Sequence, residues 1–72
     1  MNTDWIEQVM RMNAAIVEAE TRHDAQVATL VVLAHRGQDT TQAKRLLASY
    51  RQNLDLMRGI QGELLQDTHG VE

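Results

Sequence analysis

The sequence contains no cysteine, no proline and no phenylalanine, and only one tryptophan and one tyrosine. Without cysteine the chain can form neither a disulfide bond nor a thiolate zinc site. The lack of proline, with alanine and leucine as the leading apolar residues, favours helix over strand. We therefore expect a small all-α protein that is stabilised by a partner subunit or by metal bound through nitrogen and oxygen ligands.

Long hydrophobic runs and a strong excess of charge are also missing. The longest apolar run, from Val27 to Ala34, includes a threonine and is far shorter than the roughly 20 apolar residues of a bilayer span. The net charge of −3 creates no field that attracts nucleic acid or an anionic membrane. Asp4 and Glu7 stand where a signal peptide has basic residues, so the expected location is cytoplasmic.

The clearest helical pattern lies between Asp39 and Leu65. One row of apolar residues recurs every seven positions and has apolar neighbours on both sides. The row is Ala43, Tyr50, Met57 and Leu64, and its neighbours are Leu46, Leu47, Leu54 and Ile60. A stripe about three positions wide per heptad is typical of a helix packed on several other helices. We predict a helix over about residues 40–66, and we expect the polar residues 67–72 to form a disordered tail.

A second helical pattern runs from about residue 3 to residue 36. Its main row, with a period of seven, is Val9, Ile16, His23 and Leu30. The middle of this segment is more polar than its ends, but it contains no glycine or proline, so we predict one continuous helix. A break near residues 21–24 is the alternative. Residues 27–34 are apolar almost all round, which predicts burial on all sides.

Residues 35–39 predict a tight turn between these helices. Gly37 suits the left-handed conformation just past a helix end. Asp39 is placed to cap the next helix, with Gln42 three residues on as in a capping box. A turn at residues 37–39 makes the helices antiparallel. The sequence therefore predicts one domain over residues 1–66, a two-helix antiparallel hairpin.

The predicted helices differ in length, and this difference predicts self-association. At 1.5 Å per residue the first spans roughly 50 Å and the second roughly 40 Å, so the Trp5 end would extend beyond the hairpin. A lone hairpin would leave this overhang in water. We therefore expect a homodimer in the form of a four-helix bundle, although the sequence pattern does not distinguish a dimer from a tetramer. The predicted self-association or partner-binding residues are Trp5, Val9, Met12, Ile16, Val27, Val31, Tyr50 and Met57.

The turn and the second helix share a set of cap and core residues: Gly37, Asp39, Thr40, Ala43, Leu46, Leu47, Tyr50, Leu54 and Leu56. This set resembles a pattern in short bacterial hypothetical proteins that reads roughly G-x-D-T-x-x-A-x-x-L-L-x-x-[FY]-x-x-x-L-x-L. The resemblance covers only the turn and the second helix, about a third of the chain, and implies a helical hairpin. No activity is known for those proteins, so the resemblance implies none.

Glu20 and His23 form an E-x-x-H pair, the spacing of a carboxylate–histidine ligand pair in di-iron bundles. The second helix offers only Asp55 as a nearby acid, and Asp55 lies off the apolar stripe, so we expect no metal site. Instead we expect His23 and Asn53 to form a polar core layer that fixes helix register, with an exposed His23 as the alternative. No nucleophile motif or pocket is indicated, so we expect no catalytic residues and no cofactor.

A basic ridge on the second helix supports an alternative function. Lys44, Arg51 and Arg58 recur every seven residues, which in a hairpin dimer suits binding to nucleic acid. No aromatic residue accompanies the ridge, and charged heptad rows are usually solvated faces. The function expected first is therefore non-catalytic, namely helix-mediated self-association, with another protein as a further partner at Trp5.

Overall fold

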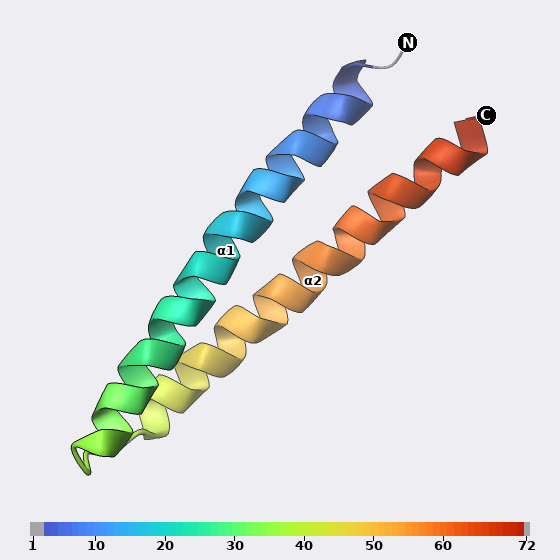
Figure 1. The fold of residues 1–72 in the computed structure, drawn as a ribbon. Helices are drawn as coiled ribbons and strands as arrows, with labels where there is room; N and C mark the ends of the chain where they lie inside the picture. Colours follow the sequence, from blue (N-terminus) through green and yellow to red (C-terminus); the bar gives the residue numbers. More distant parts are fainter. Residues whose placement is uncertain (1–2, 72) are drawn as a thin grey trace.

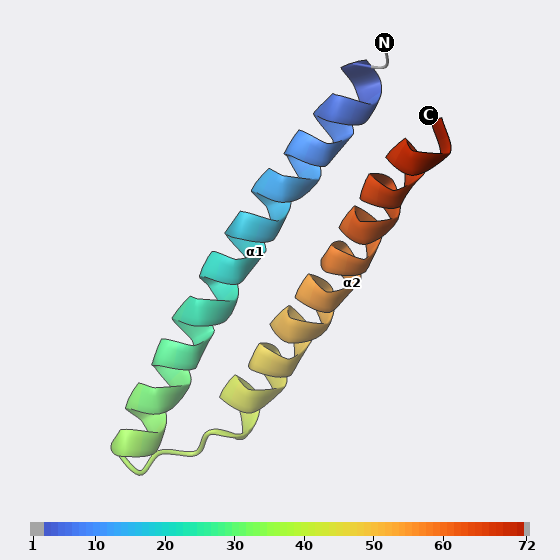
Figure 2. The ribbon, with the colours of Figure 1, turned by 45° about the vertical axis from the view of Figure 1, so that its right-hand side comes forward.

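The computed structural model describes residues 3–71, and it describes the side chains of residues 4–66. The chain forms two α-helices, α1 (Thr3–His35) and α2 (Thr41–Val71). The helices run antiparallel and side by side, so both ends of the described chain lie opposite the turn (Figures 1 and 2). The hairpin is elongated, measuring 56 × 15 × 12 Å. The predicted all-α antiparallel hairpin is confirmed.

The first helix is unbroken, so the alternative break near residues 21–24 does not occur. Much of the polar middle is solvated. Its exposed side chains bond within the helix, as in the pair of Arg22 with Glu18 at 3.1 Å and the Thr21 hydroxyl that donates to the Val17 carbonyl at 3.0 Å. Pairs four residues apart support an exposed helix face by a few tenths of a kcal/mol.

Gly37 ends α1 as predicted. Its φ of 70° is left-handed, and the Gly37 amide donates to the Ala34 carbonyl at 3.1 Å. The Gln38 amide donates to the Leu33 carbonyl at 3.0 Å. These two bonds form the Schellman arrangement, which satisfies helix carbonyls that would otherwise lack a partner.

The start of α2 lies one residue later than predicted. The Lys44 amide donates to the Thr40 carbonyl at 2.9 Å, so Thr40 occupies the cap position. Asp39 precedes it, and its carboxylate accepts hydrogen bonds from the Thr41 amide at 3.0 Å and the Thr41 hydroxyl at 2.7 Å. These two bonds hold the pKa of Asp39 below its ordinary value of 3.8, and Lys44 adds a smaller effect in the same direction. Asp39 therefore stabilises the helix start from the preceding position.

The second helix is longer than predicted. It continues to Val71, so the backbone of residues 67–71, which we expected to belong to a disordered tail, is helical. Glu72 lies outside the described residues. Gly59 and Gly62 lower helix propensity but keep their amide donors, and no proline interrupts the hydrogen-bond ladder. The helices have 33 and 31 residues, so the predicted overhang of α1 is wrong.

The helices meet along a narrow seam of buried and half-buried residues at alternating intervals of three and four. On α1 the seam residues are Trp5, Val9, Met12, Ile16, Ala19, His23, Gln26, Leu30 and Leu33. Beyond the turn they are the cap residue Thr40 and, on α2, Ala43, Leu47, Tyr50, Leu54, Met57, Gln61 and Leu64. This alternation is the pattern of a two-stranded coiled coil. It is narrower than the three-position stripe read from the sequence, because each helix has only one neighbour.

Candidate functional site

The hairpin leaves many of its large apolar side chains uncovered. Within the described side chains only Ile16, Ala19, Ala43 and Leu54 form a buried core. Among the side chains of residues 4–66, ten large apolar ones are exposed: Ile6, Met10, Val17, Val27, Val31, Val32, Leu46, Leu56, Ile60 and Leu65. The excess of exposed over buried apolar residues makes the outer surface of the hairpin the candidate functional region.

The predicted association residues divide between the seam and this surface. Six of them lie in the seam: Trp5, Val9, Met12, Ile16, Tyr50 and Met57. Val27 and Val31 are exposed, at 37% and 60%, although the sequence pattern predicted burial of residues 27–34 on all sides. The first group holds the hairpin together, and only Val27 and Val31 are open to another chain.

Trp5 lies in the seam at the free end of the hairpin. Its indole N–H donates a hydrogen bond of 2.8 Å to the Leu64 carbonyl on α2, and its side chain is half-buried. We expected Trp5 to lie on an overhang where a partner protein docks. That geometry does not occur, because α2 is long enough to pack beside Trp5.

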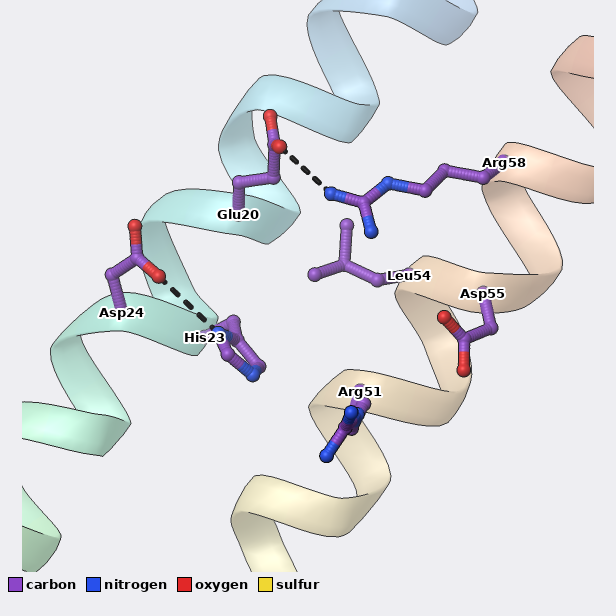
Figure 3. A pocket seen from close by; sticks show the side chains of 7 residues that line it. All are labelled: Glu20, His23, Asp24, Arg51, Leu54, Asp55 and Arg58. Atoms are coloured by element: carbon purple, nitrogen blue, oxygen red, sulfur yellow. Dashed lines mark hydrogen bonds and ion pairs between the residues drawn. The ribbon is translucent and has the colours of Figure 1, made fainter.

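One face of the hairpin carries a polar pocket, and we call it the charged face (Figure 3). The pocket is lined mainly by charged side chains: Glu20, Asp24, Arg51, Asp55 and Arg58, together with His23 and Leu54. Arg58 pairs with Glu20 at 2.9 Å across the two helices. Both side chains are about half exposed, so solvent screening limits this pair to less than about 1 kcal/mol.

The charged face also carries six of the ten exposed apolar residues. Residues three, four or seven positions apart share one side of a helix. On α1, Ile6, Met10, Val17, Val27 and Val31 are separated from Glu20 or Asp24 by three, seven or twice seven residues, so they lie on the same side of the helix. A step of seven from Arg58 reaches Leu65 on α2. The other four, Val32, Leu46, Leu56 and Ile60, lie on the opposite face.

The predicted polar layer of His23 and Asn53 is wrong. His23 lies in the seam, with its side chain 25% exposed, and its Nδ1 is 3.2 Å from the Asp24 carboxylate. Asn53 is exposed beside the seam. Leu54 instead points from α2 toward α1 and fills the space next to His23 (Figure 3).

Two glutamines that we did not predict make further polar contacts between the helices, besides the Trp5–Leu64 bond and the Arg58–Glu20 pair. The Gln26 side chain donates to the Ala43 carbonyl at 3.1 Å, and the Gln61 side chain donates to the Asn13 side chain at 2.8 Å. Gln26 follows His23 by three residues and Gln61 follows Leu54 by seven, so both lie at seam spacing. That spacing is the signal that the sequence contains, and it is not visible in the apolar rows because glutamine is polar.

Neither a metal cluster nor a bilayer-spanning helix is found in the described part of the chain. No group of three or more histidine, aspartate or glutamate side chains among these residues is placed to hold a metal ion. Neither described helix is long and apolar enough to cross a membrane.

The basic ridge lies on the charged face. Arg51 and Arg58 line the pocket beside Asp55, and Arg58 is already paired with Glu20. Acidic groups therefore lie along the middle of the ridge, where a phosphate backbone would bind. Binding of nucleic acid stays a prediction that no contact in the structure favours.

Comparison of the chain with known protein families, with curated proteins and with solved structures finds no match. The resemblance to short bacterial hypothetical proteins therefore stays a prediction. Any statement about function depends on the geometry of the hairpin itself.

Proposed function

We propose that this protein is a non-catalytic association module whose helices mediate self-association into a homodimer. The observation that carries the proposal is an imbalance in the described hairpin. Four apolar residues are buried, whereas ten large apolar residues are exposed. A two-helix layer of this size buries too little apolar surface to offset its conformational entropy comfortably. A second hairpin covers part of the exposed surface and thickens the core.

The accessible surface supports the same proposal. The hairpin exposes 5785 Å². A compact monomer of 8.2 kDa is expected to expose about 4,500 Å², so this chain exposes about 1,200 Å² more. A standard interface buries about 800 Å² on each partner. One hairpin therefore has enough excess surface for one such interface, and two hairpins packed face to face form a four-helix bundle.

Sedimentation equilibrium tests the proposal. Over a range of micromolar concentrations we expect the mass to approach twice the 8.2 kDa of the chain and to be unchanged by a chelator. A mass that stays at one chain up to about 100 µM, where even an interaction of about −5.5 kcal/mol would be seen, would overturn the proposal.

Binding of a different protein at the Trp5 end and a cytoplasmic location stay predictions. The Trp5 hydrogen bond to α2 accounts for that side chain within the hairpin itself. Self-association is therefore the function that the geometry supports best.

A further inference from the structure

We infer that the dimer forms through the charged face, with both turns at the same end of the bundle and α1 of each copy packed on α2 of the other. This inference rests on the proposed self-association and adds the face and the relative direction of the two copies. The distribution of apolar residues and of charge on the hairpin supports this arrangement.

The apolar residues select the face. Six of the ten exposed large apolar residues lie on the charged face, against four on the opposite face. They occur toward both ends of the pocket, with Ile6, Met10 and Leu65 toward the free end and Val27 and Val31 toward the turn. A second hairpin on this face would therefore make apolar contacts at both ends and charged contacts in the middle, the reverse of the usual apolar centre and polar rim, so the central charges need opposite charges across the interface.

Charge is divided between the two helices of this face. The α1 side carries two carboxylates, Glu20 and Asp24, and no lysine or arginine at the spacing of that side. The α2 side carries Lys44, Arg51 and Arg58, together with the carboxylate of Asp55. Two negative charges on α1 therefore lie beside a net of two positive charges on α2, since three cations less one carboxylate leave +2.

This division of charge selects the direction of the dimer. A two-fold axis parallel to the helices puts both turns at one end and stacks α1 of one copy on α2 of the other. Opposite charges then face each other across the interface. An axis perpendicular to the helices puts the turns at opposite ends and stacks α1 on α1 and α2 on α2. Like charges then face each other, and such contacts are unfavourable by up to several kcal/mol.

The residue register agrees with the same-end arrangement. When both turns lie at one end, an α1 residue lies level with the same α2 residues in the other copy as in its own hairpin. Ile6 then lies near the partner's Leu65, and Glu20 lies near the partner's Arg51. Gly62 lies on the α2 side of this face, and a Cβ added there would meet no atom within 4 Å of the hairpin. Its lack of a side chain leaves space at the level of Met10 of the other copy.

Distance measurement between spin labels tests the direction. The chain has no cysteine, so Gln38→Cys gives one labelling site per chain, in the exposed turn. Packed helices lie about 10 Å apart, so turns at the same end place the two labels within about 25 Å, including the label arms. Turns at opposite ends separate the labels by a distance close to the 56 Å length of the hairpin, and that result would overturn the inference.

Two matched substitutions test the face. Ile6 is 42% exposed on the charged face, and Ile60 is 47% exposed on the opposite face. We expect Ile6→Glu to raise the dimer Kd at least about tenfold, because an unpaired carboxylate is buried beside the partner's Leu65. Ile60→Glu should change the Kd by less than about twofold. An equal or larger effect of Ile60→Glu would overturn the choice of face, with helicity by circular dichroism confirming that both variants fold.

These outcomes separate the inference from the proposed function. A wild-type chain that sediments as a monomer contradicts self-association itself. A dimer whose labels lie far apart, or whose Kd responds to Ile60→Glu and not to Ile6→Glu, keeps self-association and contradicts only the arrangement inferred here.

Discussion

Replacement of Leu54 by alanine tests whether the narrow seam carries the stability of the hairpin. Leu54 is the most buried described residue, at 4% exposure, and packs with Ile16 and Ala19. Truncation of a buried leucine costs about 2–5 kcal/mol. The seam is one side chain deep and can relax into a cavity, so we expect about 2–3 kcal/mol, a large fraction of the roughly 4–10 kcal/mol of a domain this size.

Leu56 supplies a matched control on the same helix. It is 68% exposed, so Leu56→Ala removes little buried area and should cost less than about 1 kcal/mol, further reduced by the high helix propensity of alanine. Urea unfolding followed by circular dichroism measures both variants, at one fixed protein concentration because dimerisation is linked to folding. Equal losses for Leu54→Ala and Leu56→Ala would refute the assignment of Leu54 to the seam and of Leu56 to the uncovered surface.

Four further substitutions test the turn, the interior of α2 and the free end. Gly37→Ala puts a Cβ at a φ of 70° and should lower the unfolding free energy by about 1–2 kcal/mol, whereas Gly59→Ala, in open helical space, should raise it by up to about 1 kcal/mol. Urea titration checks both signs. The pKa of Asp39 is lower in the folded state, so its stabilisation is present above its unfolded-state pKa and is lost as the pH falls through its folded pKa. The stability difference between wild type and Asp39→Ala should therefore shrink between about pH 6 and pH 2, and a constant difference would contradict this account. Trp5→Phe removes the indole donor to α2 and should cost about 0.5–1.5 kcal/mol in the same assay, with an unchanged stability as the contradicting result.

The features that could be predicted from the sequence are those that local chemistry decides. Gly37 indicated a left-handed helix end, and its φ of 70° bears that out. Asp39 indicated a helix start, and it binds Thr41 there, although Thr40 takes the cap position. Continuity of α1 followed from the absence of glycine and proline in its polar middle.

The features that could not be predicted depend on how many neighbours each helix has. A row of apolar residues shows which positions prefer burial, but one neighbouring helix covers only two positions per heptad. Val31 was therefore predicted to be buried and is 60% exposed in the hairpin. The Glu20–Arg58 pair joins residues 38 apart in sequence, so it needs the register between the helices, which spacing within one helix does not contain.

Contacts between the two helices join residues that are farther apart in the sequence the farther the contact lies from the turn. The Gln26–Ala43 bond near the turn joins residues 17 apart, and the Trp5–Leu64 bond at the free end joins residues 59 apart. Each contact farther from the turn closes a longer loop unless the contacts nearer the turn have already formed. Opening therefore begins at the free end and proceeds toward Gly37, so the turn is the last part to separate and the first to form. Force applied between the two ends of the chain would separate the helices one contact at a time. The seam offers little mechanical resistance to a force in this direction.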